Sequence, residues 1–337
     1  MLFITLIMLT GLAILYLIGP RLSVDQTIRP IELPEDLDGY LATREANVPN
    51  LRPDTEQTII WADPERKQKT AYAIVYLHGF SANRQETAPM TDRIAETIGA
   101  NLYYPRLTGH GQLGQELGQV TINDWLNDSL EALKIGQRLG EKLILIGTST
   151  GAPLACWLAN RPEMTNLHAL LFVSPNFAVK DPRSRITFWP WGELIIPLLV
   201  GRLRHWQPNN LLHAKFWTND YPPQALLAMM GAVKLMQSLD LAQIKAPLFI
   251  AYCPDDQVVS IPAMQHFFPL FGSELKFMLP VEQTEDPENH VLAGQALSPR
   301  NTEGLTQTML GFLYRTRPNG FSKSVGSVGS KPQPART

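Results

Sequence analysis

One short stretch of the chain places an isolated serine between two glycines. Gly147, Ser149 and Gly151 form a Gly-x-Ser-x-Gly pattern, with an apolar run, Leu143–Ile146, before it and a helical stretch, Ala152–Ala159, after it. A sharp turn from strand to helix strains the serine backbone and leaves room only for small neighbours. The pattern therefore predicts that Ser149 is a nucleophile with its hydroxyl exposed at a sheet edge.

An activated serine requires a general base, and the base requires a carboxylate to orient it. In a parallel sheet such groups gather in the loops at the carboxyl ends of the strands. His290 follows the last predicted strand, and Asp255 and Asp256 follow the strand before it. The order serine, aspartate, histidine along the chain is typical of one large class of hydrolases, with either aspartate as the orienting group.

Alternating strands and helices predict an α/β fold with a mainly parallel sheet and helices on both faces. The predicted strands are Thr58–Trp61, Ala71–Leu77, Asn101–Tyr104, Leu143–Ile146, Leu167–Val173, Pro247–Tyr252 and Leu275–Leu279. The predicted helices, besides the one after Ser149, are Pro89–Ile98, Ile122–Leu139, Ile261–Phe271 and Thr306–Tyr314.

The first residues differ from the rest because Met1–Gly19 carries no charge. As a helix it would be about 28 Å long, close to a hydrocarbon core. No basic residue precedes Arg21 and no small-residue cleavage site follows, so residues 1–20 predict an uncleaved transmembrane anchor, with an unusual cleaved signal as the alternative. Arg21 and Arg29 weakly favour a catalytic body on the cytoplasmic side of that membrane.

The remaining segments are defined by composition. Residues 21–57 contain scattered prolines and predict an extended lead-in to a body over residues 58–316. Residues 175–240 contain many aromatic and large aliphatic side chains without a clear strand, which predicts a helical cap inserted in the body. Residues 317–337 are rich in Gly, Ser, Pro and Lys and are predicted to be disordered.

Bulk properties exclude several classes of function. The chain has 337 residues and a formal net charge of −2, which argues against nucleic acid as its main partner. His, Cys and carboxylate residues do not cluster at a spacing suited to a metal site. Gly109, Gly111 and Gly114 match a dinucleotide-binding pattern, but Arg106–Thr108 separates them from the preceding strand. No metal or cofactor is therefore expected.

Residues 58–316 resemble the α/β-hydrolase superfamily, and within it most of all the monoacylglycerol-lipase, lysophospholipase and carboxylesterase-like serine hydrolases. The family often has His before the nucleophile and a second Gly after the elbow, where this chain has Thr148 and Ala152. The resemblance is carried by His78-Gly79-Phe80, Gly109-His110-Gly111, the Gly147–Gly151 elbow, Pro254-Asp255-Asp256-Gln257-Val258-Val259 and Asn289-His290-Val291-Leu292.

The resemblance implies a role for each site residue. Ser149 is the nucleophile, His290 the general base and acid, and Asp256 the orienting carboxylate, since it fits the family's Asp-x-Val-Val pattern better than Asp255. The family also implies an oxyanion hole made by the backbone N–H groups of Phe80 and Thr150. We expect the two histidines in the His-Gly and Gly-His-Gly motifs to support loops.

The combined expectation is a membrane-anchored carboxylic ester hydrolase that works without a cofactor through an acyl-serine intermediate. The apolar cap and the anchor favour a lipid-like acyl ester, such as a monoacylglycerol or a lysophospholipid. One alternative is a peptidase or amidase of the same fold, which the few cap carboxylates (Asp181, Glu193 and Asp220) disfavour. The other is a non-catalytic lipid-binding or scaffold protein, which has no need of a complete serine, aspartate and histidine set.

Overall fold

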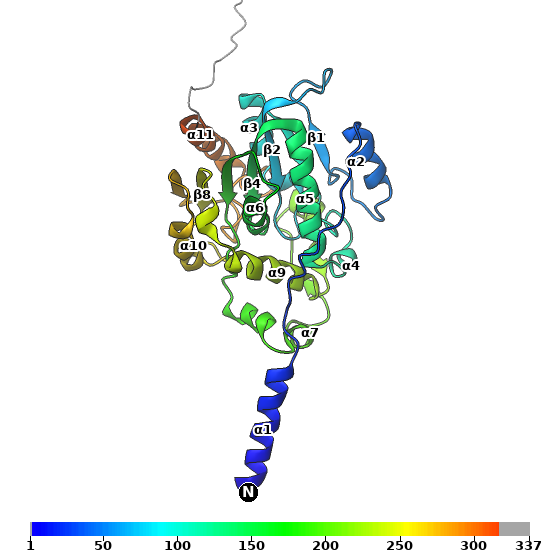
Figure 1. Ribbon diagram of the computed structural model, residues 1–337, viewed down its shortest axis with the longest axis vertical. Coiled ribbons are helices and arrows are strands. Elements are labelled where there is room, and N and C mark those ends of the chain that lie inside the picture. Colours follow the sequence, from blue (N-terminus) through cyan, green and yellow to red (C-terminus); the bar gives the residue numbers. More distant parts are fainter. Residues whose placement is uncertain (1, 317–337) are drawn as a thin grey trace, which may run out of the picture.

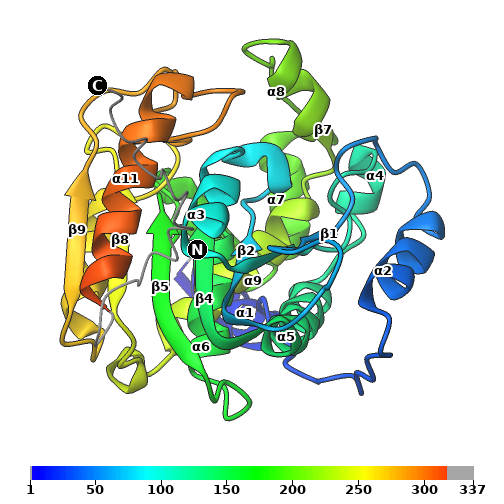
Figure 2. The same cartoon turned by 90° about the horizontal axis from the view of Figure 1, so that it is seen from above.

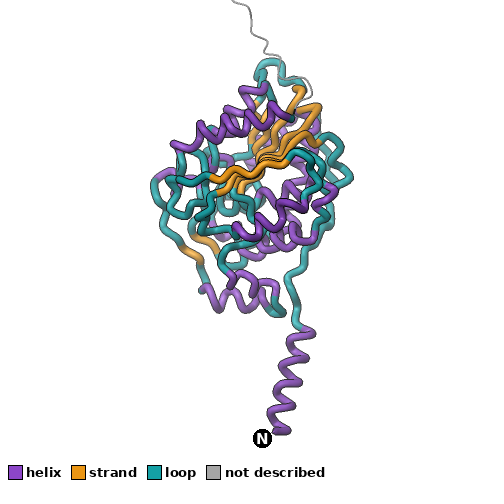
Figure 3. Tube along the Cα trace, turned by 90° about the vertical axis from the view of Figure 1, so that its left-hand side faces the viewer, coloured by secondary structure: helices purple, strands orange, loops and turns teal. Residues whose placement is uncertain are grey.

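A twisted seven-stranded sheet forms the centre of the computed structural model, which describes residues 2–316 (Figure 3). The strand order is β1-β3-β2-β4-β5-β8-β9, and all neighbours are parallel except β1, which runs antiparallel to β3. The strands are β1 Thr58–Ile60, β2 Thr70–Leu77, β3 Asn101–Tyr104, β4 Gly140–Thr148, β5 Leu167–Val173, β8 Leu248–Tyr252 and β9 Lys276–Pro280. The predicted mainly parallel sheet is confirmed.

Helices cover both faces of this sheet (Figure 2). One face packs against α3 (Met90–Ile98) and α11 (Pro299–Arg315). The other packs against α5 (Ile122–Leu139), α6 (Gly151–Ala159), α9 (Ala225–Ser238) and α10 (Ile261–Phe267). Short 3-10 turns lie at Arg84–Glu86, Pro182–Phe188, Leu241–Gln243 and Phe268–Leu270, and a short helix α4 lies at Gly114–Leu117.

The central strand β4 shows why these residues form a sheet. Leu143 and Leu145 point into the core that contains α5 and α6, while Ile144 and Ile146 point into the core that contains α3 and α11. Side chains of a strand alternate between the two faces, so an unbroken apolar run fits a strand that is covered on both sides. β4 is therefore packed on both faces up to Thr148, the residue that precedes Ser149.

The N-terminal helix α1 (Leu2–Ile18) extends away from the body in Figure 1. It ends where Pro20 follows Gly19, because proline has no N–H to continue a helix. Within residues 2–316 we find no helix with the length and apolar content needed to cross a membrane. The predicted transmembrane anchor at 1–20, the membrane partner and the membrane location were therefore wrong.

The lead-in and the cap differ in detail from the sequence-based expectation. The lead-in contains a helix, α2 (Leu37–Ala46), whose first turn is capped by the side chain of Asp36. The cap holds α7 (Gly192–Val200) and α8 (Leu211–Phe216), together with a two-stranded ribbon of β6 (Arg204–His205) and β7 (Asp220–Tyr221) that was not predicted. Because α9 buries most of one face in the main core, it packs as part of the body's helical layer. The predicted disordered segment 317–337 lies outside the described residues.

A leucine in β4 provides a test of this packing. Leu145 is fully buried, whereas Leu198 in α7 is 84% exposed. We expect Leu145→Ala to lower the free energy of unfolding by about 2–5 kcal/mol, since it removes buried methyl groups and leaves a cavity. Leu198→Ala, the matched control, should change it by less than about 1 kcal/mol. Guanidinium denaturation of both variants measures the difference, and equal effects would contradict the buried position of β4.

Candidate active site

Ser149 has a left-handed backbone, with a φ of 49°. Its neighbours leave no space for larger residues: a Cβ at Gly147 would lie 2.8 Å from Ala152 Cα, and one at Gly151 would lie 1.9 Å from the Leu77 carbonyl oxygen. Non-glycine residues in this region of the Ramachandran map are strained by about 1–3 kcal/mol. Glycines at both positions are thus a steric requirement of a tight turn from β4 into α6.

A continuous chain of hydrogen bonds joins the three residues that the sequence singles out. Ser149 Oγ lies 2.9 Å from Nε2 of His290, and His290 Nδ1 lies 2.8 Å from Oδ2 of Asp256. The three come from loops after β4, β8 and β9, at the carboxyl edge of the sheet. In this geometry Asp256 accepts the Nδ1 proton, so Nε2 is left free to accept the hydroxyl proton of Ser149.

The carboxylate of Asp256 is fixed by its own loop. Its Oδ1 accepts hydrogen bonds from the backbone N–H groups of Val258 at 2.7 Å and Val259 at 2.9 Å, while Oδ2 accepts from His290. Asp256 is 1% exposed, whereas its neighbour Asp255 is exposed to solvent. Of the two aspartates that the sequence offers, it is Asp256 that the structure brings to His290.

A second aspartate, Asp286, supports the His290 loop and was missed by the sequence analysis. Its Oδ2 accepts hydrogen bonds from the backbone N–H groups of His290 at 3.0 Å and Val291 at 2.8 Å. It is 4% exposed, although it lies in a stretch that also carries Glu282, Glu285 and Glu288. The backbone carbonyl of His290 also accepts a hydrogen bond from Ser174 Oγ at 2.7 Å, so the loop is held on both sides.

The electrostatic environment favours a positive charge on His290. Burial alone would lower the pKa of its imidazole, but the Asp256 carboxylate, with smaller contributions from Asp286 and Glu86, outweighs burial and raises that pKa above its ordinary value. A raised pKa means that the imidazolium form is stabilised. This is the form that a general base takes after it has accepted a proton from a serine.

The His-Gly motif orients the Gly79–Phe80 peptide. The N–H of Leu107 donates to His78 Nε2 at 3.1 Å, so the proton of this imidazole is on Nδ1, which donates to the carbonyl oxygen of Gly79 at 2.9 Å. Burial lowers the pKa of His78 to about 4, which keeps it neutral. In a trans peptide the N–H points opposite to the C=O, so this contact also fixes the direction of the Phe80 N–H.

The second expected oxyanion donor, Thr150, is buried and directly precedes α6. N–H groups at the start of a helix lack partners within the helix, and the helix dipole favours negative charge there. The structure thus brings the backbone of Thr150 next to Ser149 by chain connectivity, and it packs the Gly79 loop against the same serine: a Cβ at Gly79 would lie 3.2 Å from Ser149 Cβ.

The cap is tied to the loop that follows Phe80. Ser81 O accepts a hydrogen bond from the N–H of Thr218 at 2.8 Å, and the Phe80 ring meets the Tyr221 ring edge to face at 5.2 Å. Beside the site, apolar side chains from the Phe80 loop, the cap and the His290 loop pack into one cluster. Its buried members are Ala82, Phe216, Trp217, Val291, Ala296 and Leu297.

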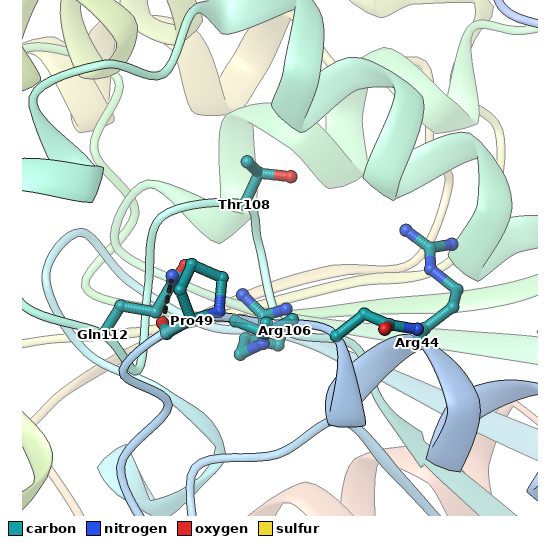
Figure 4. Close-up of a pocket in the computed structure, with 7 residues that line it drawn as sticks. Arg44, Pro49, Arg106, Thr108 and Gln112 are labelled. Carbon is teal, nitrogen blue, oxygen red and sulfur yellow. Dashed lines mark hydrogen bonds between the residues drawn. The ribbon is translucent and has the colours of Figure 1, made fainter.

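An open pocket of about 400 Å³ lies elsewhere, on the side of the lead-in (Figure 4). Its charged lining residues are Arg44 and Arg106, and none of Ser149, His290 and Asp256 lines it. Arg106 forms a buried ion pair with Glu45 at 2.9 Å, and Arg44 pairs with Glu131. Because both guanidinium groups are already neutralised, this pocket is a poor site for an anion, and the reactive groups lie in another part of the molecule.

Comparison with known proteins identifies the family of the chain. The family model described as serine aminopeptidase, S33 matches residues 68–279, more than half of the chain. Among curated proteins, the thermostable monoacylglycerol lipase of Bacillus sp. (strain H-257) is 23% identical over 201 residues, which cover 59% of this chain and 76% of that lipase.

Solved structures show the same fold. A chain from the work on LipS and LipT, two metagenome-derived lipolytic enzymes, matches with a TM-score of 0.63 and 20% identity, covering 79% of this chain and 99% of its own. Monoglyceride lipase of Saccharomyces cerevisiae matches with a TM-score of 0.57 and 14% identity, covering 77% and 91%. At these identities the likeness establishes the α/β-hydrolase fold alone. The family match over residues 68–279 goes further: the chain is a hydrolase and belongs to the serine aminopeptidase S33 family.

Proposed function

We propose that this protein hydrolyses carboxylic esters through an acyl-serine intermediate, with Ser149 as nucleophile, His290 as general base and acid, and Asp256 as the orienting carboxylate. The observation that carries the proposal is the unbroken hydrogen-bond chain from a strained, tightly packed serine through His290 to a buried aspartate. A purely structural role gives no reason to hold a serine in a strained conformation against an imidazole nitrogen.

In the first half of the reaction, Ser149 Oγ attacks the ester carbonyl carbon while its proton passes to His290 Nε2. The carbonyl oxygen becomes negative and accepts hydrogen bonds from the N–H groups of Phe80 and Thr150. The tetrahedral intermediate then collapses, the C–O bond to the alcohol breaks, and the leaving alcohol takes the proton from His290. The products of this half are the free alcohol and an acyl ester on Ser149.

In the second half, a water molecule attacks the acyl carbon and gives a proton to His290 Nε2. The new tetrahedral intermediate uses the same two backbone donors. It collapses by breaking the bond to Ser149 Oγ, which recovers the proton from His290 as the carboxylic acid leaves. Throughout, the carboxylate of Asp256 keeps the proton of Nδ1 in place and balances the positive charge of the imidazolium.

For the substrate we propose a small acyl ester such as a monoacylglycerol or lysophospholipid. The apolar cluster that joins the loops of Phe80 and His290 to the cap makes the surroundings of the site apolar, which suits an acyl chain. Its members are Ala82, Phe216, Trp217, Val291, Ala296 and Leu297. The similarity to a bacterial protein named monoacylglycerol lipase supports the same class.

Amide cleavage is the second candidate, since the matching family is described as serine aminopeptidase. A substrate with a free amine needs a carboxylate near the site. In the described part of the cap, Asp181 pairs with Arg183 at 2.6 Å, Asp220 pairs with His205 at 2.6 Å, and Glu193 is exposed. This distribution favours an ester over an aminoacyl substrate.

The substrate class is tested by a panel of p-nitrophenyl esters from acetyl to palmitoyl, with aminoacyl p-nitroanilides alongside. We expect the esters to be cleaved, with kcat/KM rising toward longer acyl chains. Ser149→Ala should reduce turnover to background, because a lost nucleophile costs several orders of magnitude, about 10⁶ in one well-studied serine hydrolase. Cleavage of the anilides alone would contradict the ester proposal, and full activity in Ser149→Ala would remove the nucleophile.

The neighbouring aspartates provide a matched pair of variants. Asp256→Asn should reduce kcat by roughly 10³–10⁴-fold, because the amide no longer fixes the imidazole tautomer or balances its charge. Asp255→Asn makes the same chemical change at an exposed side chain and should leave kcat within about twofold of the wild type, as expected for a substitution away from the reacting groups. Steady-state kinetics on a short ester distinguish the two, and a larger loss in Asp255→Asn would reassign the orienting carboxylate.

The pH dependence follows from the charge on His290. Only the neutral imidazole accepts a proton from Ser149, so activity should rise with pH as His290 loses its proton. Since nearby carboxylates raise the pKa of His290, we expect the acidic limb of kcat/KM to be centred above the ordinary histidine value of about 6.5. A limb centred well below that value would contradict the electrostatics described here.

A further inference from the structure

A buried carboxyl, Glu86, lies beside the site without a role in the steps above. It ends the short 3-10 turn Arg84–Glu86 between β2 and α3, and it is 2% exposed. Its Oε2 accepts two hydrogen bonds, from the N–H of Gly79 at 2.8 Å and from the hydroxyl of Tyr76 at 2.9 Å. Among residues 2–316, no cationic side chain is hydrogen-bonded to Glu86. A buried carboxyl without such a partner is costly, so its position calls for an explanation.

The hydrogen bond to Gly79 places Glu86 on the loop that directs the Phe80 N–H. The Gly79 carbonyl is held by His78 and the Gly79 N–H by Glu86, so the peptide groups on both sides of Gly79 are fixed. A Cβ at Gly79 would lie 2.5 Å from Glu86 Oε1 and 3.2 Å from Ser149 Cβ. The Glu86 carboxyl and Ser149 therefore both pack against Gly79.

Two further contacts link Glu86 to the other site loops. The hydroxyl of Tyr76 lies 3.0 Å from Oγ1 of Thr148, the residue immediately before Ser149. On the side of the His290 loop, a Cβ at Gly294 would lie 2.4 Å from the backbone oxygen of Glu86. Glu86 thus touches the oxyanion loop directly, the nucleophile turn through Tyr76, and the segment that follows His290.

The charges of Glu86 and His290 interact, because Glu86 packs against the glycine that contacts Ser149 and His290 is hydrogen-bonded to the same serine. Burial raises the pKa of Glu86 to about 7, although the hydrogen bonds from Gly79 and Tyr76 and the positive charge of His290 oppose that rise. The phenols that face this region, Tyr76 and Tyr104, stay neutral because burial raises their pKa values. The carboxylates of Asp256 and Asp286 also act on the imidazole of His290. The charge of Arg84 acts on Asp54 and Tyr104.

We propose that Glu86 is a positioning residue for the proposed hydrolysis: it fixes the peptide that presents the Phe80 N–H, and as a carboxylate it stabilises the imidazolium form of His290. This inference rests on the proposed roles of Ser149 and His290. Glu86 transfers no proton in the scheme above. It acts through the backbone of Gly79 and through its charge.

Two variants separate these contributions. Glu86→Gln keeps an oxygen that can accept from Gly79 and Tyr76 but removes the charge, so the acidic limb should move to lower pH by about half a unit. Glu86→Leu removes both the charge and the hydrogen-bond acceptor, so the plateau rate constant should also fall, by about tenfold or more. This loss should be smaller than the roughly 10²–10³-fold loss caused by removing an oxyanion donor itself. Tyr76→Phe, which removes one donor to the carboxyl, should lower the plateau less than Glu86→Leu does.

Asp128→Asn is the matched control. Asp128 is a half-buried carboxyl whose pKa is also raised by burial, to about 6. It accepts hydrogen bonds from the backbone N–H and hydroxyl of Thr108 at 2.6 and 3.1 Å. The charges that act on it are those of Arg106 and Arg44, and His290 is not among them. Asp128→Asn should therefore change neither the position of the acidic limb nor the plateau rate constant.

The readout is the rate constant for phosphonylation of Ser149 by a fluorophosphonate, followed from pH 5 to 9 on the full-length chain. Ser149 Oγ attacks phosphorus, fluoride leaves, and the serine proton passes to His290, so the measurement does not depend on which ester is cleaved. Near-UV circular dichroism of each variant checks that the fold is retained.

The outcomes separate this inference from the proposed function. A limb shifted in Glu86→Gln but not in Asp128→Asn supports the role of Glu86, whichever esters are turned over. The role of Glu86 is overturned if the acidic limb of Glu86→Gln coincides with that of the wild type and if Glu86→Gln, Glu86→Leu and Tyr76→Phe all keep the wild-type plateau rate. In that case Ser149 remains the nucleophile. A wild-type chain that is not labelled at Ser149 overturns both proposals.

Discussion

The tight turn at Ser149 is the constraint on which the rest of the site depends. Its left-handed backbone is held because Gly147 and Gly151 pack against backbone atoms of the elbow and of β2, where no side chain fits. Such strain costs about 1–3 kcal/mol, and it persists only where the surroundings leave the chain no alternative. β4 supplies that condition, since its apolar residues are buried in both helical layers and each contributes about 1.5–3 kcal/mol.

Around this fixed serine, the site is built largely from backbone groups held by buried polar side chains. His78 and Glu86 hold the two sides of Gly79, Asp286 holds the His290 loop, and the backbone of Val258 and Val259 holds Asp256. Each of these buried side chains has hydrogen-bond partners that also define the position of a loop. The same contacts therefore stabilise the fold and fix the geometry of the site. When His290 accepts a proton, its positive charge forms close to the carboxylates of Asp256, Asp286 and Glu86.

Much of this arrangement could be predicted from the sequence, because it depends on local patterns. Apolar runs such as Leu143–Ile146 predicted strands, and the flanking glycines predicted the turn at Ser149. Asp286 and Glu86 were not predicted, because a carboxylate in a polar loop has the same sequence signature whether it faces water or backbone N–H groups. Their burial is a property of how distant loops meet. The N-terminal run was misread because an uncharged stretch does not show how long its helix is, and that helix lacks the length and apolar content of a membrane span.

The position of β9 has a consequence for how the protein unfolds. This strand lies at one edge of the sheet, and among the described strands it pairs with β8 alone. Most of its side chains are partly exposed, yet the loop after it carries His290. Edge elements with few buried contacts open at lower free energy than central ones. Opening of β9 and its loop would separate the imidazole from Ser149 while β4 and the elbow stay folded. Under mild denaturant, Ser149 should then lose its reactivity before the core unfolds cooperatively.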